Sequence, residues 1–488
     1  MSLGLEINFR MIFKFIGILL MILTPFMAIS GLWSVYFDEP QALRSILLSS
    51  AITLIVGLVL TVLTWKHDHR NIGKKEGYVI VTLTWVFISA FGALPFFFSG
   101  YFPSYTDAFF ETMSGFTTTG ATVLSDIEAV PKGLLFWRSM THWLGGMGII
   151  VLTLAILPIL GVGGMRLFIA EAPETTTNKL HPRITETAKR LWGIYFILTM
   201  VQTLLLMAGG LDLFDALNHA FSTMSTGGFS TKNDSIAGFS AFNQYIIIVF
   251  MILAGLNFSL HYYTLKGQFA KVAKNEEIRL YLLTILGASL VISVLLFFSI
   301  YTDYEKAFRD SLFQVVSIIT TTGFVSADYL AWGEPIWILI FMVMFTGGCI
   351  GSTAGGIKMV RHLILLKNIR YEFRRLIHPN AIIPIKLNGK TLPLEIIYHI
   401  LAFFMIYLLV MAIGTVVMVF IGLDFESAIG ATVASLGNIG PGIGSVGPIE
   451  NYSHVPLLGK WFLSFLMLVG RLELFTVLML LSPSFYKN

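Results

Sequence analysis

The tetrapeptide Thr320-Thr321-Thr322-Gly323 is polar and ends in glycine, although it lies inside a strongly apolar part of the chain. The same four residues occur earlier as Thr117-Thr118-Thr119-Gly120. In both copies an aspartate, Asp107 or Asp310, lies 13 residues before the glycine. A register shared over this length indicates an internal repeat, which organises the rest of the chain.

Two further copies are more diverged. Asp215 lies 13 residues before Gly228, so this copy aligns without a gap. The last copy runs from Glu426 to Gly440; it needs a one-residue insertion, and Asn438-Ile439 replace the threonine pair. We therefore predict a fourfold unit. We call its four polar ends the tips: Thr118–Gly120, Thr226–Gly228, Thr321–Gly323 and Asn438–Gly440.

Composition indicates that the chain lies in a membrane. Of its 488 residues, 56% are hydrophobic and only 12% are charged, whereas soluble domains have about 25% charged residues. Apolar runs of about 20 residues recur, each long enough to cross bilayer hydrocarbon. Because backbone groups in lipid must find partners within the chain, we expect an all-α polytopic membrane protein. The single cysteine, Cys349, excludes an internal disulfide.

The apolar runs divide the chain into an N-terminal helix pair and four repeats. Each repeat has an apolar helix, a half-helix that leads into a tip, and a returning helix. The middle part is too polar and too rich in glycine to span, so we expect a re-entrant loop that lines a water-filled path. The expected boundaries are 1–70 for the helix pair and 71–165, 166–272, 273–378 and 379–488 for repeats 1 to 4. Returning helices are expected at 136–160, 245–269, 336–366 and 457–481.

The distribution of basic residues predicts the orientation. With a cytoplasmic N-terminus, the inside segments hold 24 of the 32 lysine and arginine residues, as the positive-inside rule requires. Ten spanning helices then place both termini in the cytoplasm and all four tips toward the outside. The outer segments carry acidic residues that we expect to raise the local cation concentration. They are Asp107, Glu111, Asp126, Asp215, Asp310, Asp424 and Glu426.

The residue types of the tips suggest cation binding by backbone carbonyls. Glycine allows a positive φ or a close backbone approach, so successive carbonyls can turn inward and replace the water shell of an ion, as in potassium filters. Threonine is stiff at χ1 and helps to fix the carbonyl directions. Carboxylates at the tips would suggest a divalent site instead, and none of the four tips has one.

The returning helix of the third repeat is interrupted by the glycine-rich loop Thr346–Gly356. Glycine at this density does not propagate a helix, since each costs about 1 kcal/mol relative to alanine. We interpret this loop as a gate beneath the tips; a packing seam of small residues is the alternative. A Walker phosphate loop is excluded, because Ile357 follows Gly356 where the motif needs lysine.

Arg471 lies within an apolar helix, and an ionisable residue inside the membrane is a functional candidate. We expect it to repel cations in the path or to hold the glycine-rich loop; a structural ion pair with another helix is the alternative. Glu473 is only two residues further on, so it faces another side of the helix and is a poor partner.

These features together resemble the Trk/Ktr/HKT superfamily of cation transporters over essentially the whole length. The extra N-terminal helix pair favours its TrkH branch. The resemblance rests on the repeats and on Gly120, Gly228, Gly323, Gly440, the run Gly347–Lys358 and Gly470-Arg471-Leu472-Glu473. It implies a pseudo-fourfold, potassium-selective uptake pore in the inner membrane, and not an enzyme. It also implies a homodimer with a cytosolic, nucleotide-binding regulator of the TrkA type.

The resemblance also implies roles for particular residues. The filter carbonyls are those of Thr118, Thr119, Thr226, Gly227, Thr321, Thr322, Asn438 and Ile439, each pair followed by Gly120, Gly228, Gly323 or Gly440. The gate comprises Gly347, Gly348, Gly351, Ser352, Thr353, Gly355, Gly356 and Arg471. Glycine rather than serine at position 120 favours potassium over sodium. The diverged fourth tip suggests weaker discrimination against sodium than in a true fourfold channel.

Two other classes of function were weighed. A membrane enzyme would need a nucleophile–base or metal constellation, and the sequence has no Gly-x-Ser-x-Gly, His-x-x-x-His or Cys/His cluster. A sodium- or proton-coupled symporter would be expected to use inverted repeats, whereas these repeats run parallel; coupling stays open. The transported K⁺ is the expected ligand, with no covalent cofactor and no nucleic acid. The basic cluster Arg370–Arg375 fits either lipid head groups or the regulator.

Overall fold

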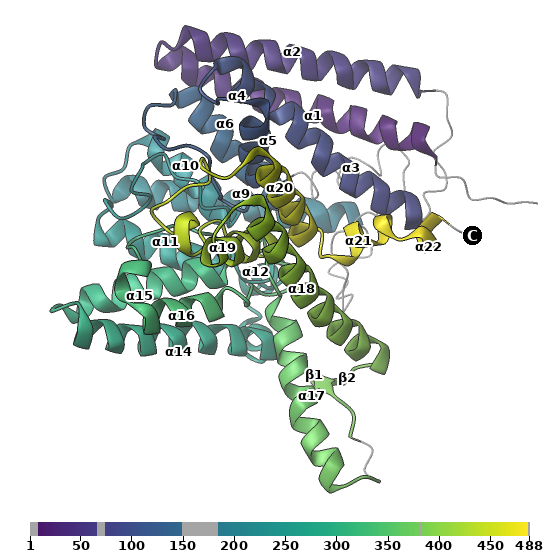
Figure 1. The fold of residues 1–488 in the computed structure, drawn as a ribbon, viewed down its shortest axis with the longest axis vertical. Coiled ribbons are helices and arrows are strands. Elements are labelled where there is room, and N and C mark those ends of the chain that lie inside the picture. Colours follow the sequence, from purple (N-terminus) through teal and green to yellow (C-terminus); the bar gives the residue numbers. More distant parts are fainter. Residues whose placement is uncertain (1–7, 66–73, 149–183, 381–382, 487–488) are drawn as a thin grey trace, which may run out of the picture.

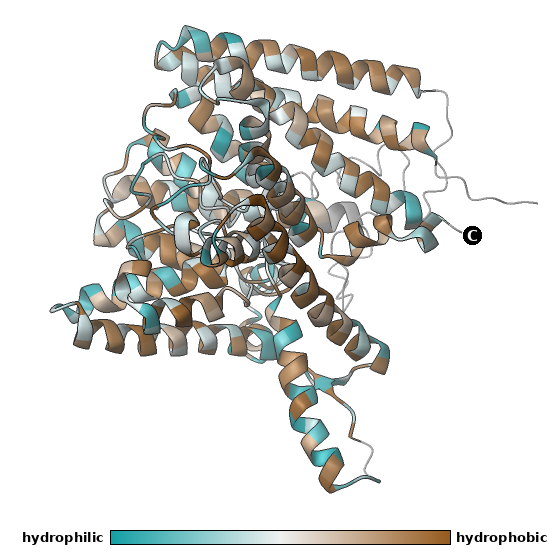
Figure 2. Cartoon of the chain, in the orientation of Figure 1, coloured by the Kyte–Doolittle hydropathy of each residue, from teal (hydrophilic) through white to brown (hydrophobic). Residues whose placement is uncertain are grey.

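The computed structural model describes residues 8–65, 74–148, 184–380 and 383–486, and these are mostly helical (Figure 1). Helices α1 (Phe9–Tyr36) and α2 (Pro40–Leu63) form the N-terminal pair along one edge of the bundle. They pack against each other, and α1 also packs on α3 and α6. The outer side of α2 is strongly apolar (Figure 2). Its exposed Leu47, Ile55 and Val62 suit contact with lipid.

In each of the four units a long helix packs on the half-helix that follows it. The long helices are α3 (Lys74–Gly92, continued by α4, Leu94–Ser99), α9 (Ile184–Ala208), α14 (Glu276–Ser299) and α18 (Leu394–Ile421). The half-helices are α5 (Tyr105–Phe116), α10 (Leu213–Met224), α15 (Tyr304–Ile319) and α19 (Phe425–Leu436). Most half-helix residues are buried, so these four short elements lie inside the bundle.

The returning helices are more broken than the sequence predicted. In the third unit, α16 (Glu334–Val343) and α17 (Met359–Ile377) flank the expected interruption. The helices predicted at 245–269 and 457–481 are also interrupted, so the prediction of continuous helices there was wrong. They divide into α11 (Ala241–Ala254), α12 (Phe258–Leu265) and α13 (Phe269–Ala273), and into α20 (Leu457–Arg471), α21 (Phe475–Leu481) and α22 (Pro483–Tyr486).

Local backbone geometry explains both breaks. Helices α11 and α12 meet at an angle of 102°, and the Asn257 side chain caps the second of them by accepting from Ser259 N–H. Between α20 and α21, Glu473 and Leu474 have φ values of 58° and 45°, which no right-handed helix continues through. In the first unit, α6 (Lys132–Trp143) passes into the π-helical turn η1 (Leu144–Gly148). The rest of its predicted helix lies outside the described residues.

Fewer helices are long enough to span a membrane than the apolar runs of the sequence predicted. Within the described residues, six helices are long and apolar enough to cross a membrane, or seven if α11 and α12 form one span. The ten expected spans included the four returning helices, which are broken or extend beyond the described ranges. The several long apolar helices nevertheless define a membrane protein.

Neighbouring units are joined by a recurring contact between a returning helix and the next half-helix. Helix α6 packs on α10, α11 on α15, and α20 on α5. The last of these contacts joins the fourth unit to the first. The third and fourth units meet instead where Tyr329 Oη donates to Gly442 O over 2.6 Å, so the four units close into a ring. Short single turns, η2 (Leu330–Trp332) and η3 (Gly444–Val446), follow the third and fourth tips.

A small hairpin corrects the all-α prediction. Strands β1 (Lys386–Leu387) and β2 (Lys390–Thr391) pair antiparallel between α17 and α18. Asn388 and Gly389 have φ values of 50° and 80°, as a tight two-residue hairpin turn requires. The Asn-Gly pair was a signal in the sequence. The hairpin lies beside α17, which projects from the bundle with mixed polar and apolar surfaces (Figures 1 and 2).

Candidate ion-binding site

Each half-helix begins with a side-chain cap. Ser104, Asp212, Asp303 and Asp424 accept from backbone N–H groups of the first turn of α5, α10, α15 and α19. In three units the cap lies 16 residues before the tip glycine, at Ser104, Asp212 and Asp424; in the third it lies 20 before, because α15 begins a turn earlier. The fourth copy therefore aligns on its cap without a gap, and the predicted one-residue insertion was wrong.

Each half-helix also ends in the same way, in a Schellman motif. In the first unit, Thr119 N–H donates to Ser114 O over 2.8 Å and Thr118 N–H donates to Gly115 O over 3.0 Å. The equivalent bonds recur in the other three units at 2.8–2.9 Å and 3.0–3.2 Å. The first residue of each tip then has a positive φ: Thr118 52°, Thr226 56°, Thr321 54° and Asn438 52°.

A positive φ is unusual for a β-branched residue. Three of the tips hold threonine in this conformation, and such strain costs on the order of 1–3 kcal/mol at each position. Asparagine tolerates the conformation better. The fourth tip, which diverges most in sequence, therefore keeps the same backbone with a residue suited to it.

The four tip glycines form a closed ring. Gly120, Gly228, Gly323 and Gly440 have φ values of 84°, 81°, 78° and 99°. A Cβ atom added to any of them would strike the backbone carbonyl oxygen of the next tip around the ring. The struck oxygens belong to Gly227, Thr322, Ile439 and Thr119, in that order. The last contact returns to the first tip, so both φ and space require glycine at all four positions.

Hydrogen bonds between side chains brace the ring. The hydroxyl groups of Thr117 and Thr119 lie 2.8 Å apart, as do those of Thr320 and Thr322. The Asn438 amide donates to Thr119 Oγ1 over 3.0 Å, which links the fourth tip to the first.

A buried ion pair supports the first two tips by holding the segments that follow them. Arg138 on α6 lies 2.6 Å from Glu111 on α5, and Glu111 also accepts from Val123 N–H over 2.9 Å. Arg138 donates to Ser230 O, and its guanidinium carbon lies 3.5 Å from the Phe229 ring centroid. Arg138 was missed from the sequence, although the rule that selected Arg471, an arginine among apolar residues, applies to it equally.

Four of the seven acidic residues expected at the outer mouth are buried inside the bundle. They are Asp107, Glu111, Asp215 and Asp310. Asp107, for example, pairs with Lys460 on α20 at 2.6 Å, and both side chains are less than a tenth exposed. These carboxylates hold elements together and do not form a negatively charged mouth. Asp126, Asp424 and Glu426, in contrast, are exposed. The hydrogen bond from Asn233 lowers the pKa of Asp126.

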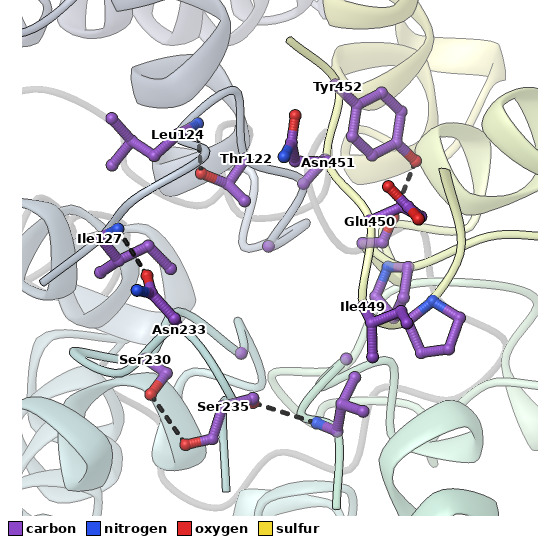
Figure 3. A pocket seen from close by; sticks show the side chains of 18 of the residues that line it. Thr122, Leu124, Ile127, Ser230, Asn233, Ser235, Ile449, Glu450, Asn451 and Tyr452 are labelled. Atoms are coloured by element: carbon purple, nitrogen blue, oxygen red, sulfur yellow. Dashed lines mark hydrogen bonds between the residues drawn. The ribbon is translucent and has the colours of Figure 1, made fainter. Parts of the chain in front are cut away.

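A cavity of about 110 Å³ lies against the four tip glycines. Figure 3 shows Thr122, Asn233, Glu450 and Tyr452 around it. These residues come from the segments that follow the tips in three different units. The charged residues that line it are Arg138, Lys232 and Glu450.

The glycine-rich loop is irregular rather than helical, and hydrogen bonds hold it from several sides. Thr353 Oγ1 donates to Met224 O and Ala254 O over 3.0 and 3.2 Å. Glu277 on α14 accepts from Ile350 N–H within the loop over 2.8 Å and from Val360 N–H at the start of α17 over 3.1 Å. The seam alternative needed helical packing here. The loop does pack closely, but without helical structure.

Arg471, at the end of α20, joins this loop to the first unit. Its guanidinium donates to Thr353 O over 2.8 Å and to Gly145 O and Gly146 O over 2.7 and 2.8 Å. Glu473 pairs with Arg361 on α17. The sequence identified Arg471 but did not reveal the two carbonyls in η1 that it binds.

Its apolar helices and ring of buried tips place the protein among polytopic helical membrane proteins. Residues 43–486 match the TrkH family, described as a cation transport protein, and the chain belongs to this family. It is 40% identical over 490 residues to the Trk system potassium uptake proteins TrkH of Salmonella typhimurium and Escherichia coli, covering 99% of this chain and 100% of each relative.

Two further proteins are similar to this chain over nearly its whole length. The Trk system potassium uptake protein TrkI of Halomonas elongata is 36% identical, over 98% of this chain and 97% of that one. The crystal structure of the potassium transporter TrkH from Vibrio parahaemolyticus superposes with a TM-score of 0.88 at 36% identity, covering 98% of this chain and 100% of that chain. These relatives are named as transport proteins and not as enzymes.

Proposed function

We propose that this protein is a potassium-selective uptake pore. The four units, 71–165, 166–272, 273–378 and 379–488, act as pseudo-symmetric repeats around one path, with 1–70 as an accessory helix pair. The closed ring of tip glycines carries this proposal, because four loops that meet around one axis create a site for a single ion. The naming of the relatives as potassium uptake proteins supports K⁺ as the ion.

The tips suit a desolvated cation. We assign its ligands to the backbone carbonyls, whose dipoles replace the hydration shell of K⁺. Each half-helix ends at the ring, so the negative ends of four helix dipoles, about −0.5 charge each, face the ion. The carbonyls belong to Thr118, Thr119, Thr226, Gly227, Thr321, Thr322, Asn438 and Ile439, with Gly120, Gly228, Gly323 and Gly440 completing the ring.

We assign the gate to the glycine-rich loop together with Arg471. The loop residues are Gly347, Gly348, Gly351, Ser352, Thr353, Gly355 and Gly356. The three hydrogen bonds of Arg471 support a tethering role, and its charge in the path would also repel K⁺. Uptake follows the membrane potential, which contributes about 2.3 kcal/mol per charge per 100 mV.

We infer the membrane, the orientation and the partners of the pore from the family and from the distribution of basic residues. We place it in the inner membrane with both termini in the cytoplasm and the tips facing outward. We expect a homodimer controlled by a cytosolic nucleotide-binding regulator. The relatives belong to a Trk system by name, which supports a second component.

The test is flux of K⁺ and Na⁺ into liposomes that contain the purified protein. Wild type should pass K⁺ in preference to Na⁺, and Gly120→Ser should reduce that preference because the new Cβ strikes Gly227 O. The matched control is Gly100→Ser: Gly100 also has a positive φ, but a Cβ there would meet nothing within 4 Å.

Three results would count against a simple pore. Equal effects of the two glycine substitutions would exclude the ring as the selectivity element. Flux that appears only with an imposed Na⁺ or proton gradient would indicate a coupled symporter. Absence of K⁺ flux from correctly folded protein, even with the cytosolic fraction added, would contradict the uptake function.

A further inference from the structure

The glycine-rich loop touches the ring of tips through one direct hydrogen bond among the described residues. Gly355 N–H donates to Thr321 Oγ1 over 2.6 Å, and both residues are buried. Thr321 is the first residue of the third tip. The bond therefore joins a proposed filter residue to a proposed gate residue with no intermediary.

The equivalent side chains of the other tips have different partners. Thr118 Oγ1 is buried and has no hydrogen-bond partner among the described residues. Thr226 Oγ1 donates to Ser225 O over 2.6 Å, within its own loop. The Asn438 amide donates to Thr119 Oγ1 and to Met467 O. Within the described part of the chain, only the third tip thus has its side chain hydrogen-bonded to the glycine-rich loop.

The loop fits closely against the tips at this point. A Cβ added to Gly355 would lie 2.8 Å from Asn438 Cβ and 2.8 Å from Gly437 O, just before the fourth tip. A Cβ added to Gly356 would lie 3.3 Å from Thr321 Cγ2. The loop therefore packs across the third and fourth tips. At this contact there is space for the backbone of the loop but not for a side chain.

We propose that Thr321 is a positioning residue whose hydroxyl group holds the glycine-rich loop against the ring. The loop cannot leave the path without breaking the bond from Gly355. Release of the loop and the conformation of the third tip are therefore coupled through this one side chain. This inference rests on the pore and gate assignments proposed above.

The expected size of the effect follows from the type of bond. A neutral hydrogen bond changes an equilibrium by about two- to tenfold. Thr321→Val keeps the shape and the β-branch but removes the acceptor, so it should raise the ratio of open to closed time by that factor. Thr321→Ser keeps the hydroxyl and should restore the wild-type ratio.

The experiment is single-channel recording of the full-length protein in planar bilayers in symmetrical KCl. It separates the open-to-closed ratio from unitary conductance, which a general disturbance of the ring would alter. Thr118→Val is the matched control: it changes an equivalent tip hydroxyl that has no hydrogen-bond partner among the described residues. Gly355→Ala is the second variant, because its new methyl group should unseat the loop while Thr321 stays intact.

The inference predicts a higher open-to-closed ratio for Thr321→Val and Gly355→Ala, and a ratio near wild type for Thr321→Ser. Thr118→Val is expected to leave the ratio close to wild type, whatever it does to conductance. Equal changes of the ratio in Thr321→Val and Thr118→Val, or no change in Thr321→Val, would overturn the coupling while leaving the pore intact. A wild-type protein without K⁺ current would instead overturn the proposed function and the coupling with it.

Discussion

The tips and the glycine-rich loop are both rich in glycine, but they use it differently. The four tip glycines all have positive φ values and each lies against a carbonyl of its neighbour. In the loop, Gly351 and Gly356 have positive φ values of 73° and 64°, but Gly347, Gly348 and Gly355 have ordinary φ values and only lack space for a side chain. Substitution at a tip therefore disturbs the site in every conformation, whereas substitution of Gly347, Gly348 or Gly355 disturbs only the packed position of the loop.

The largest effect should come from removing the support behind the tips. Glu111→Ala leaves the buried Arg138 without its carboxylate partner, which should cost about 3–5 kcal/mol of stability. Glu305→Ala is the matched control, because the Glu305 side chain is half exposed in its pair with Arg309 and should contribute at most about 1 kcal/mol. Thermal unfolding in detergent would measure both. Similar losses in the two variants would show that the buried pair does not support the tips.

A substitution within the ring should affect selectivity more than stability. Gly228→Ala places a methyl group against Thr322 O at a φ of 81°, so we expect at least a tenfold loss of K⁺ over Na⁺ preference, equivalent to about 1.4 kcal/mol. Gly210→Ala is the control, with a φ of 93° and open space around it. Flux assays with K⁺ and Na⁺ would measure the ion preference of both variants. Unchanged selectivity in Gly228→Ala would separate the ring from ion discrimination.

Arg471→Ala removes the hydrogen bonds that join the loop at Thr353 O to η1 at Gly145 O and Gly146 O. This change should raise K⁺ flux several-fold without changing selectivity. Arg471→Lys keeps the charge but not the planar fork that reaches several carbonyls. Flux from Arg471→Lys that is as high as from Arg471→Ala would indicate a tether. Flux from Arg471→Lys at the wild-type level would indicate that charge repulsion alone controls the path.

The smallest effect should come from exchanging residue types at the start of a tip. Thr118→Asn replaces a strained β-branched residue with one that tolerates positive φ, and should stabilise the protein by about 1 kcal/mol or less. Asn438→Thr should destabilise it by a similar amount, since strain is added and the bonds to Thr119 Oγ1 and Met467 O are lost. Opposite shifts in unfolding temperature would confirm the assignment, and shifts of the same sign would contradict it.

Much of the fold was predictable because its signals are local. Apolar runs predicted that a long helix opens each unit, and segments led by Asp107, Asp215, Asp310 or Glu426 before each glycine predicted the half-helices. The breaks at Gly255–Asn257 and Leu472–Leu474 were not predicted, because both lie in apolar surroundings with no dense glycine run. Four of the seven carboxylates expected at the outer mouth are buried instead, since sequence gives the side of the membrane but not the partner that buries a charge.

By itself, the sequence determined that this is a helical membrane protein with four related loops, because hydropathy and the spacing of glycines are properties of the chain alone. It also selected Arg471 and the glycine-rich loop. Only the tertiary structure decided that the four tip glycines close into one ring. It also decided that Arg138 and Lys460 support the ring and that Glu277 supports the glycine-rich loop. It likewise decided that, among the described residues, Thr321 is the tip residue whose side chain forms a hydrogen bond with the loop. Such contacts join segments up to several hundred residues apart, and no local pattern encodes which of them meet.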